Sequence, residues 1–143
     1  MSWPGRRLLV NFVTHTDPRV RGVTLRSRRP EQGFEPPTDI YETSDAIVVR
    51  VEIAGMTTDE INLALDENSG RLIISGVRED PAREEPRRYM NVEIECGEFT
   101  RVVQLPRPVL ADDTVASYDC GFLVVRLPKR VEDASEPRQV RID

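Results

Sequence analysis

Short segments in which large apolar residues alternate with polar or smaller ones recur between residues 46 and 127. Alternation over four to eight residues is typical of a β-strand that buries one face. The clearest example is Ala46–Ile53, where Val49, Val51 and Ile53 alternate with Val48, Arg50 and Glu52. Because turn signals separate the segments and no long helical periodicity lies between them, the pattern predicts an antiparallel β-sandwich or a small barrel.

The same pattern predicts the other strands and their turns. Thr57–Glu60 resembles a capped helical turn, and residues 77–88 form a charged stretch with two prolines, which predicts a solvent-exposed loop or excursion. Glu67–Gly70 and Asp119–Gly121 carry turn residues. We expect further strands at Ile61–Asp66, Arg71–Ser75, Tyr89–Ile94, Phe99–Leu105, Val115–Tyr118 and Phe122–Leu127.

The first 36 residues differ in character from the strands that follow. Prolines and glycines interrupt them, which excludes long helices and interior strands, although a short helix around Arg6–Val13 is possible. Seven arginines stand here against three acidic residues, whereas the whole chain has a net charge of −5. A basic arm on an acidic body can be steered toward nucleic acid, an anionic membrane or the acidic body of a second copy. We favour the second copy, because the arm also contains Trp3, Leu8, Leu9, Val10, Phe12 and Val13.

Cysteine and histidine, two residue types that often carry catalysis or bind metal, are scarce in this chain. Cys96 and Cys120 do not make a disulfide framework, and His15 is the single histidine of the chain. The sequence contains no glycine-rich phosphate loop of the P-loop type and no apolar run of membrane-spanning length. We therefore expect a cytoplasmic protein that is not an enzyme, has no cofactor or metal, and binds neither specific nucleic acid nor membranes.

Several short motifs, in the order in which they occur, resemble the α-crystallin domain of small heat-shock proteins. They are Pro37–Thr43, Leu72-Ile-Ile-Ser-Gly76, Gly97-Glu-Phe99 followed by Leu105-Pro106, Ala116–Leu123, Leu127-Pro-Lys129 and Val140-Arg-Ile142. The resemblance covers about residues 36–143. It implies an all-β fold, an immunoglobulin-like antiparallel β-sandwich at 37–129, with a flexible, variable N-terminal arm at 1–36 and a C-terminal tail at 130–143 that carries an anchoring motif.

The resemblance also implies a function, that of an ATP-independent chaperone. Such a chaperone holds unfolding client proteins and works as a dynamic homo-oligomer built from dimers. Val140 and Ile142 resemble the family's C-terminal anchor, and their spacing places both side chains on one side of an extended tail. The anchor is expected to fill an apolar groove on a neighbouring copy, lined from two sheet edges by Leu72, Ile74, Leu123, Val125 and Leu127; ordinary core packing is the alternative for these five residues.

The same resemblance assigns roles to two further sets of residues. In the family's dimer, a short strand of the excursion loop is exchanged between partners, which assigns Arg88, Tyr89, Met90 and Glu93 to the dimer loop. Ile94 stands where many members have an arginine, so the details of dimer pairing depart from that pattern. Client binding is assigned to the apolar residues of the arm, which alternatively pack the interior of the oligomer: Trp3, Leu8, Leu9, Phe12 and Val13.

Two other functions remain open at this level. A monomeric adaptor of the CS-domain type uses a related sandwich to bind a larger chaperone, although such adaptors usually lack both the C-terminal motif and the charged excursion. A nucleic-acid-associated protein that uses the arginine-rich arm is the third possibility, and its binding would weaken steeply with salt.

Overall fold

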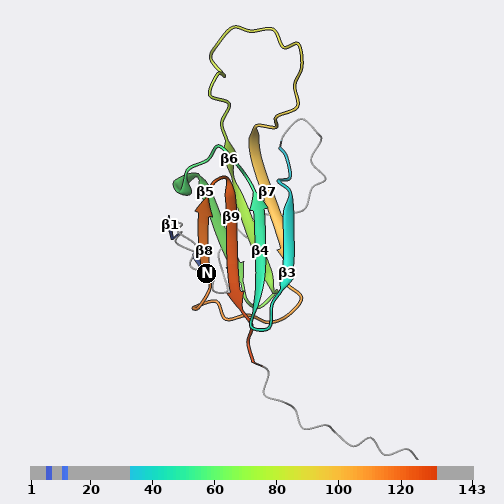
Figure 1. Ribbon diagram of the computed structural model, residues 1–143, viewed down its shortest axis with the longest axis vertical. Helices are drawn as coiled ribbons and strands as arrows, with labels where there is room; N and C mark the ends of the chain where they lie inside the picture. The colour runs from blue at the N-terminus through green and yellow to red at the C-terminus, as the bar shows by residue number, and fades with distance from the viewer. Residues whose placement is uncertain (1–5, 8–10, 13–32, 132–143) are drawn as a thin grey trace, which may run out of the picture.

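Two β-sheets pack face to face in the computed structural model, which describes residues 6–7, 11–12 and 33–131 of the chain (Figure 1). In the first sheet the described strands lie in the order β1 (Arg6–Arg7), β8 (Val115–Asp119), β9 (Phe122–Pro128), β4 (Ala46–Glu52) and β3 (Thr38–Glu42). In the second the order is β2 (Asn11–Phe12), β5 (Ile61–Asp66), β6 (Arg71–Arg78) and β7 (Gly97–Gln104).

The predicted antiparallel sandwich is confirmed, with one parallel exception. All described ladders are antiparallel except β2 with β5, which pairs Asn11 with Ala64 and Phe12 with Leu65. The short helix considered around Arg6–Val13 is wrong for the described part of that segment, because β1 and β2 lie there as strands on the edges of the two sheets. No helix in the described part of the chain is both long and apolar enough to cross a membrane.

Alternate residues of the long strands form the core between the sheets. Val49, Val51 and Ile53 point inward as predicted and are fully buried, while Arg50 and Glu52 face solvent. Burial of this apolar surface is the main stabilising term of such a sandwich. Leu72 and Leu123 are also fully buried, one from each sheet, so both layers contribute to one continuous core.

Short turns connect the strands where the sequence predicted them. At the predicted capped turn, a 3-10 helix covers Thr58–Glu60, and the amide of Thr57 donates to the Glu60 carboxylate at 2.7 Å. The β8–β9 hairpin turns at Cys120 and Gly121, whose φ angles are 48° and 82°. Both central residues therefore take positive φ, as a type I′ two-residue turn requires, and Cys120 does so without being a glycine.

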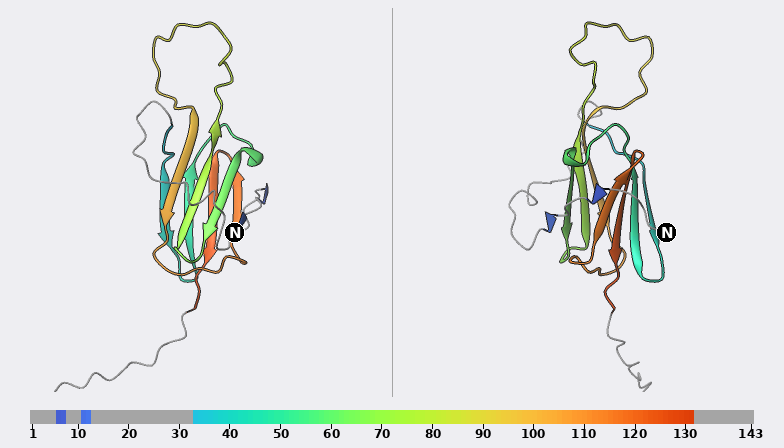
Figure 2. Two further views of the ribbon diagram at one scale, coloured as in Figure 1. Left: turned by 180° about the vertical axis from the view of Figure 1, so that it is seen from behind. Right: turned by 60° about the vertical axis from the view of Figure 1, so that its left-hand side comes forward.

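The predicted strand Tyr89–Ile94 is wrong for this chain on its own. The described residues between β6 and β7 form a loop, 79–96, that extends beyond the end of both sheets (Figures 1 and 2). A strand forms only where a neighbouring strand satisfies its backbone N–H and C=O groups, and no strand of the described sandwich lies alongside this loop.

Candidate interface between copies of the chain

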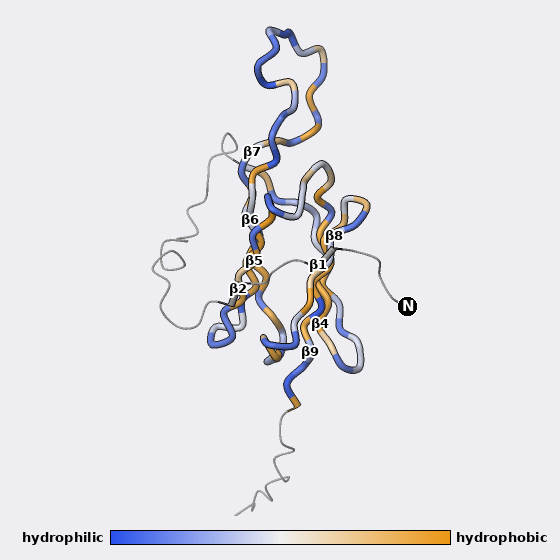
Figure 3. Tube along the Cα trace, turned by 90° about the vertical axis from the view of Figure 1, so that its left-hand side faces the viewer, coloured by the Kyte–Doolittle hydropathy of each residue, from blue (hydrophilic) through white to orange (hydrophobic). Residues whose placement is uncertain are grey.

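The loop 79–96 exposes apolar side chains to an unusual degree. Met90, Val92 and Ile94 keep 90%, 63% and 80% of their surface exposed. Figure 3 shows hydrophobic and hydrophilic residues in succession along this loop, well away from the core. Such exposed apolar residues on a projecting segment mark a surface that another chain can cover.

The four residues assigned to the dimer loop all lie on this segment and are exposed. They are Arg88, Tyr89, Met90 and Glu93. The Asn91 amide donates to the Glu93 carboxylate at 2.9 Å, and the Tyr89 hydroxyl donates to Asp80 at 3.3 Å. The structure therefore brings these four residues onto one loop, while their role in pairing stays a prediction.

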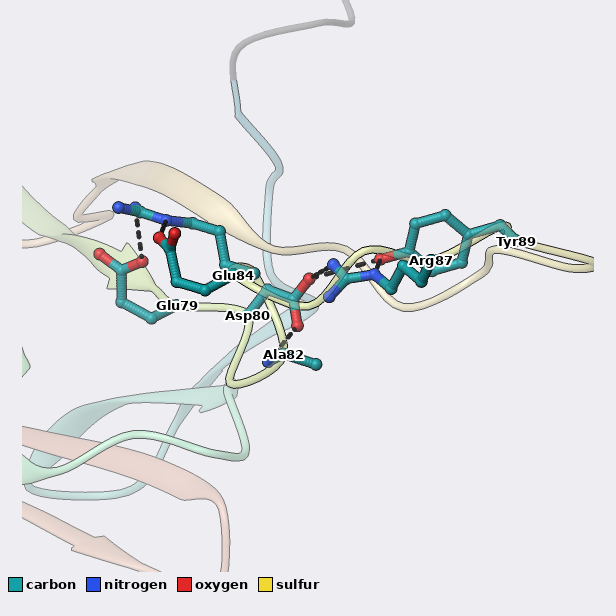
Figure 4. A network of polar contacts seen from close by, with 7 residues as sticks. Glu79, Asp80, Ala82, Glu84, Arg87 and Tyr89 are labelled. Atoms are coloured by element: carbon teal, nitrogen blue, oxygen red, sulfur yellow. Dashed lines mark hydrogen bonds and ion pairs between the residues drawn. The ribbon is translucent and has the colours of Figure 1, made fainter.

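Asp80 holds the first half of the loop together (Figure 4). Its carboxylate accepts the amide of Ala82 at 2.9 Å and also pairs with the guanidinium of Arg87. Arg87 in turn donates to the Tyr89 hydroxyl at 2.8 Å and stacks over the Tyr89 ring, 4.9 Å from its centre. The amide of Ala82, together with Arg87 and Tyr89, lowers the pKa of Asp80 below its ordinary value. The loop is thus preorganised by contacts within itself.

Strand β3 forms one edge of its sheet and carries two exposed apolar side chains. β4 is its one pairing partner in the described part of the chain. Ile40 and Tyr41 are 47% and 48% exposed. An edge strand with a free row of backbone donors and acceptors is a template for pairing with another chain.

The five predicted groove residues lie in the core instead of on an open groove. All five are fully buried between the two sheets: Leu72, Ile74, Leu123, Val125 and Leu127. Their expected position on edge strands is wrong, since β6 lies between β5 and β7, and β9 lies between β8 and β4. In the single chain these five residues therefore pack in the core, which is the alternative that the sequence left open. A role in a docking groove stays a prediction.

On that side β1 and β2 of the N-terminal arm are the outermost described strands, and they pair with β8 and β5. Arg6 and Arg7 pair with Tyr118 and Ser117 of β8, while β2 pairs with β5. Of the predicted client-binding residues, Phe12 belongs to β2, where it is described through its backbone pairing alone. The rest lie outside the described residues, as does the C-terminal anchor: Trp3, Leu8, Leu9 and Val13, and Val140 and Ile142.

A cluster of ion pairs, which the sequence did not reveal, lies where the described chain ends. The carboxylate of Glu42 lies 2.6 Å from Arg107 and 2.6 Å from Lys129, and the bond with Lys129 lowers the pKa of Glu42. The Lys129 amide also donates to the Asp45 carbonyl at 2.9 Å. These contacts fix the point from which residues 130–143 continue, at the opposite end of the sandwich from the loop (Figure 1).

Comparison with known proteins shows the family. The model of the Hsp20/alpha crystallin family matches residues 39–143. The chain is 32% identical over 139 residues to "Heat shock protein 16" of Schizosaccharomyces pombe, an alignment that covers 94% of this chain and 89% of the relative. It is 35% identical over 103 residues to the "17.8 kDa class I heat shock protein" of Arabidopsis thaliana, covering 72% of this chain and 64% of the relative.

A solved structure, "Heat shock protein 16.0 from Schizosaccharomyces pombe", is similar with a TM-score of 0.63 and 30% identity, over 77% of this chain and 99% of that chain. The chain spans about two thirds of the length of several relatives, such as 66% of "Spore protein SP21" of Stigmatella aurantiaca. Since the family model covers most of its length and one relative is matched almost completely, the chain belongs to the Hsp20/α-crystallin family of small heat-shock proteins.

Proposed function

We propose that this small heat-shock protein is an ATP-independent holdase that works in the cytoplasm as a dynamic oligomer of dimers. The observation that carries the proposal is the loop 79–96, which presents Met90, Val92 and Ile94 to solvent beyond the sandwich. The family match supports the chaperone class, and the exposed loop supports assembly with further copies of the same chain.

The dimer forms by exchange of this loop between two copies. Met90, Val92 and Ile94 are spaced two residues apart, so in an extended strand they share one face, while Tyr89, Asn91 and Glu93 share the other. A strand added to the free edge of β3 gains main-chain hydrogen bonds, and its apolar face covers exposed apolar side chains there. Ile40 and Tyr41 point to opposite faces of β3, so the apolar face of the added strand covers one of these two exposed side chains.

Dimers assemble further through the C-terminal tail. Val140 and Ile142 act as the anchor, which docks along β5 and β8 of a neighbouring copy in place of that copy's β2 and β1. This position lies beside five buried core residues: Leu72, Ile74, Leu123, Val125 and Leu127. Each anchor residue contributes roughly 1.5–3 kcal/mol if it is fully buried. One tail is thus weak and reversible, whereas many tails in one assembly bind strongly together.

Clients bind to apolar surface that becomes accessible when the oligomer loosens on heating. The arm residues Trp3, Leu8, Leu9, Phe12 and Val13 supply this surface. Binding of exposed apolar segments needs neither a nucleotide nor a catalytic group, because the free energy comes from removal of apolar area from water.

Light scattering after size exclusion, combined with an aggregation assay on a heat-labile test enzyme, tests the proposal. The wild type should form a large oligomer and suppress aggregation without ATP. Met90→Ser/Val92→Ser/Ile94→Ser should reduce the assembly to small species, and Val140→Ala/Ile142→Ala should leave dimers. Glu84→Ser/Glu85→Ser, on the same loop, is the matched control and should assemble normally. A monomeric wild type that leaves aggregation unchanged would contradict the proposal and favour the adaptor function.

A further inference from the structure

Arg78 lies at the neck of the loop, as the last residue of β6. Its Nε donates to the carbonyl of Glu95 at 2.9 Å, and Nη2 donates to the same oxygen. Nη1 donates to the carbonyl of Ala54 at 3.3 Å. One half-buried guanidinium therefore ties the returning end of the loop to the end of β6 and to the segment that follows β4.

The same guanidinium also contacts the end of the N-terminal arm. Its Cζ lies 4.6 Å from the centre of the Phe34 ring, which packs in turn on Phe99 at 5.6 Å between ring centres. The Phe34 side chain is 8% exposed, and its amide donates to the carbonyl of Glu98 at 3.1 Å. The arm is thus docked beside the neck by both a backbone bond and a cation–π contact.

The approach of the arm to β7 depends on the residue before Phe34. A Cβ atom added at Gly33 would lie 2.6 Å from the carbonyl oxygen of Glu98, a separation at which the two backbones must move apart. The contact between Phe34 and Arg78 is therefore built on a close passage of the arm across the first residues of β7, where the loop rejoins the sheet.

We infer that Arg78 couples the docking of the N-terminal arm to the position of the loop that is exchanged with a second copy. When a client or another subunit pulls the arm, and Phe34 with it, away from Arg78, the guanidinium loses its ring partner and its hold on Glu95 weakens. The loop then becomes easier to release, so occupation of the arm speeds the exchange of subunits. The link to subunit exchange rests on the proposed function, whereas the contacts at the neck lie within one chain.

A double-mutant cycle on the full chain tests this coupling. Hydrogen exchange is followed at the neck amides of residues 76–79 and 95–99 in wild type, Phe34→Leu, Arg78→Lys and the double variant. Lysine keeps the charge of Arg78 but lacks the planar guanidinium, which stacks on the Phe34 ring and donates several hydrogen bonds at once. Phe34→Leu should speed neck exchange by roughly 2- to 5-fold, the factor expected for loss of one cation–π contact at a partly exposed site. Arg78→Lys should speed it by at least as much, because it also loses the hydrogen bonds to Glu95 and Ala54. The double variant should be no faster than Arg78→Lys alone.

Two further variants separate the coupling from loss of stability. Phe34→Tyr keeps an aromatic ring and should behave as the wild type, whereas Arg71→Lys, at the opposite end of β6, should leave the neck unchanged. Multiplicative effects of Phe34→Leu and Arg78→Lys in the double variant, or unchanged neck exchange in both single variants, would overturn the inference.

The rate of subunit exchange is a second readout, and it separates the proposed assembly from the coupling at the loop neck. The rate at which labelled and unlabelled subunits mix should rise in Phe34→Leu and Arg78→Lys by a factor similar to that at the neck. If the neck responds as expected but the protein is a monomer with no subunits to exchange, the proposed assembly is wrong and the coupling within the chain stands. If subunits mix at the wild-type rate in an assembled protein while the neck loosens, the inferred control of exchange is wrong.

Discussion

The sandwich core and the loop 79–96 use the same sequence pattern with opposite results. In β4, the inward-facing Ile47 and Val49 have no exposed surface, and the strand pairs on both sides. In the loop, Met90 and Ile94 alternate in the same way yet remain 90% and 80% exposed. The difference is the presence of neighbouring strands. An alternating segment without a partner among the described strands has the side chains of a strand but lacks the hydrogen bonds that make one.

The sharpest test of this comparison places one substitution in both regions. Ile47→Ala should lower the free energy of unfolding by about 2–5 kcal/mol, because it leaves a cavity in a fully buried site. Ile94→Ala should change it by less than about 0.5 kcal/mol, as expected for an exposed position. Urea denaturation at a subunit concentration low enough to dissociate the assembly measures both. Equal losses in the two variants would show that the loop belongs to the core of the subunit.

The junction between the two regions should also be intolerant of added volume. A Cβ atom at Gly76 would lie 2.5 Å from the carbonyl oxygen of Glu60 and 2.9 Å from the Phe99 ring. Gly76→Ala should therefore destabilise the subunit by about 1–3 kcal/mol through overpacking. Ser75→Ala, one residue earlier on β6, is the control. Comparable melting temperatures for the two variants would contradict the close packing seen at this position.

The order within the loop should depend on the charge of Asp80. Asp80→Asn should speed tryptic cleavage after Arg83, Arg87 and Arg88 by roughly 2- to 5-fold, since the pairing of an exposed carboxylate with arginine is weak but measurable. Glu84→Gln, whose carboxylate pairs with Arg83 on the same loop, is the matched control and should leave cleavage after Arg87 unchanged. Identical cleavage rates in Asp80→Asn and the wild type would show that Asp80 does not order the loop.

The pH dependence of the same contact has a defined sign. Because the pKa of Asp80 is lowered when the loop is ordered, the carboxylate stabilises this order at neutral pH, and the contribution is lost as the pH falls through the depressed pKa. That point lies below the ordinary aspartate value of about 3.9. The NMR shift of the Ala82 amide, which donates to this carboxylate, should follow the titration. A midpoint above the ordinary value would contradict the assigned contacts.

The smallest effect is expected at ion pairs on the outer surface of the sandwich. Arg50 and Asp39 pair at 3.2 Å between β4 and β3, with side chains that are 45% and 69% exposed. Asp39→Asn should therefore cost less than about 1 kcal/mol in a denaturation experiment, and high salt should abolish the difference. A larger loss that persists in salt would show that this pair is shielded from water in the assembled protein.

Much of the fold follows from local pattern, whereas the contacts at the loop neck do not. Alternation predicts β4, β5, β6, β7, β8 and β9 because each strand exposes one face and buries the other. The local sequence does not predict the role of Arg78, because its partners Glu95, Ala54 and Phe34 lie 17 to 44 positions away in the chain. Alternation predicts Leu72 and Leu123 as apolar strand residues, but it does not tell an edge strand from an interior one. Pairing order in a sheet is a non-local property, which single-strand patterns do not encode.

Cross-linking between two differently labelled copies tests directly whether the loop pairs with β3 of another chain. In a background of Cys96→Ser and Cys120→Ser, one copy carries Val92→Cys and the other carries Ile40→Cys or Tyr41→Cys; a disulfide requires Cα atoms within about 7 Å. We expect a cross-linked pair with at least one β3 position, identified by mass spectrometry, and much less product when Glu84→Cys replaces Val92→Cys. Absence of any product beyond that control would contradict the exchange of the loop between copies.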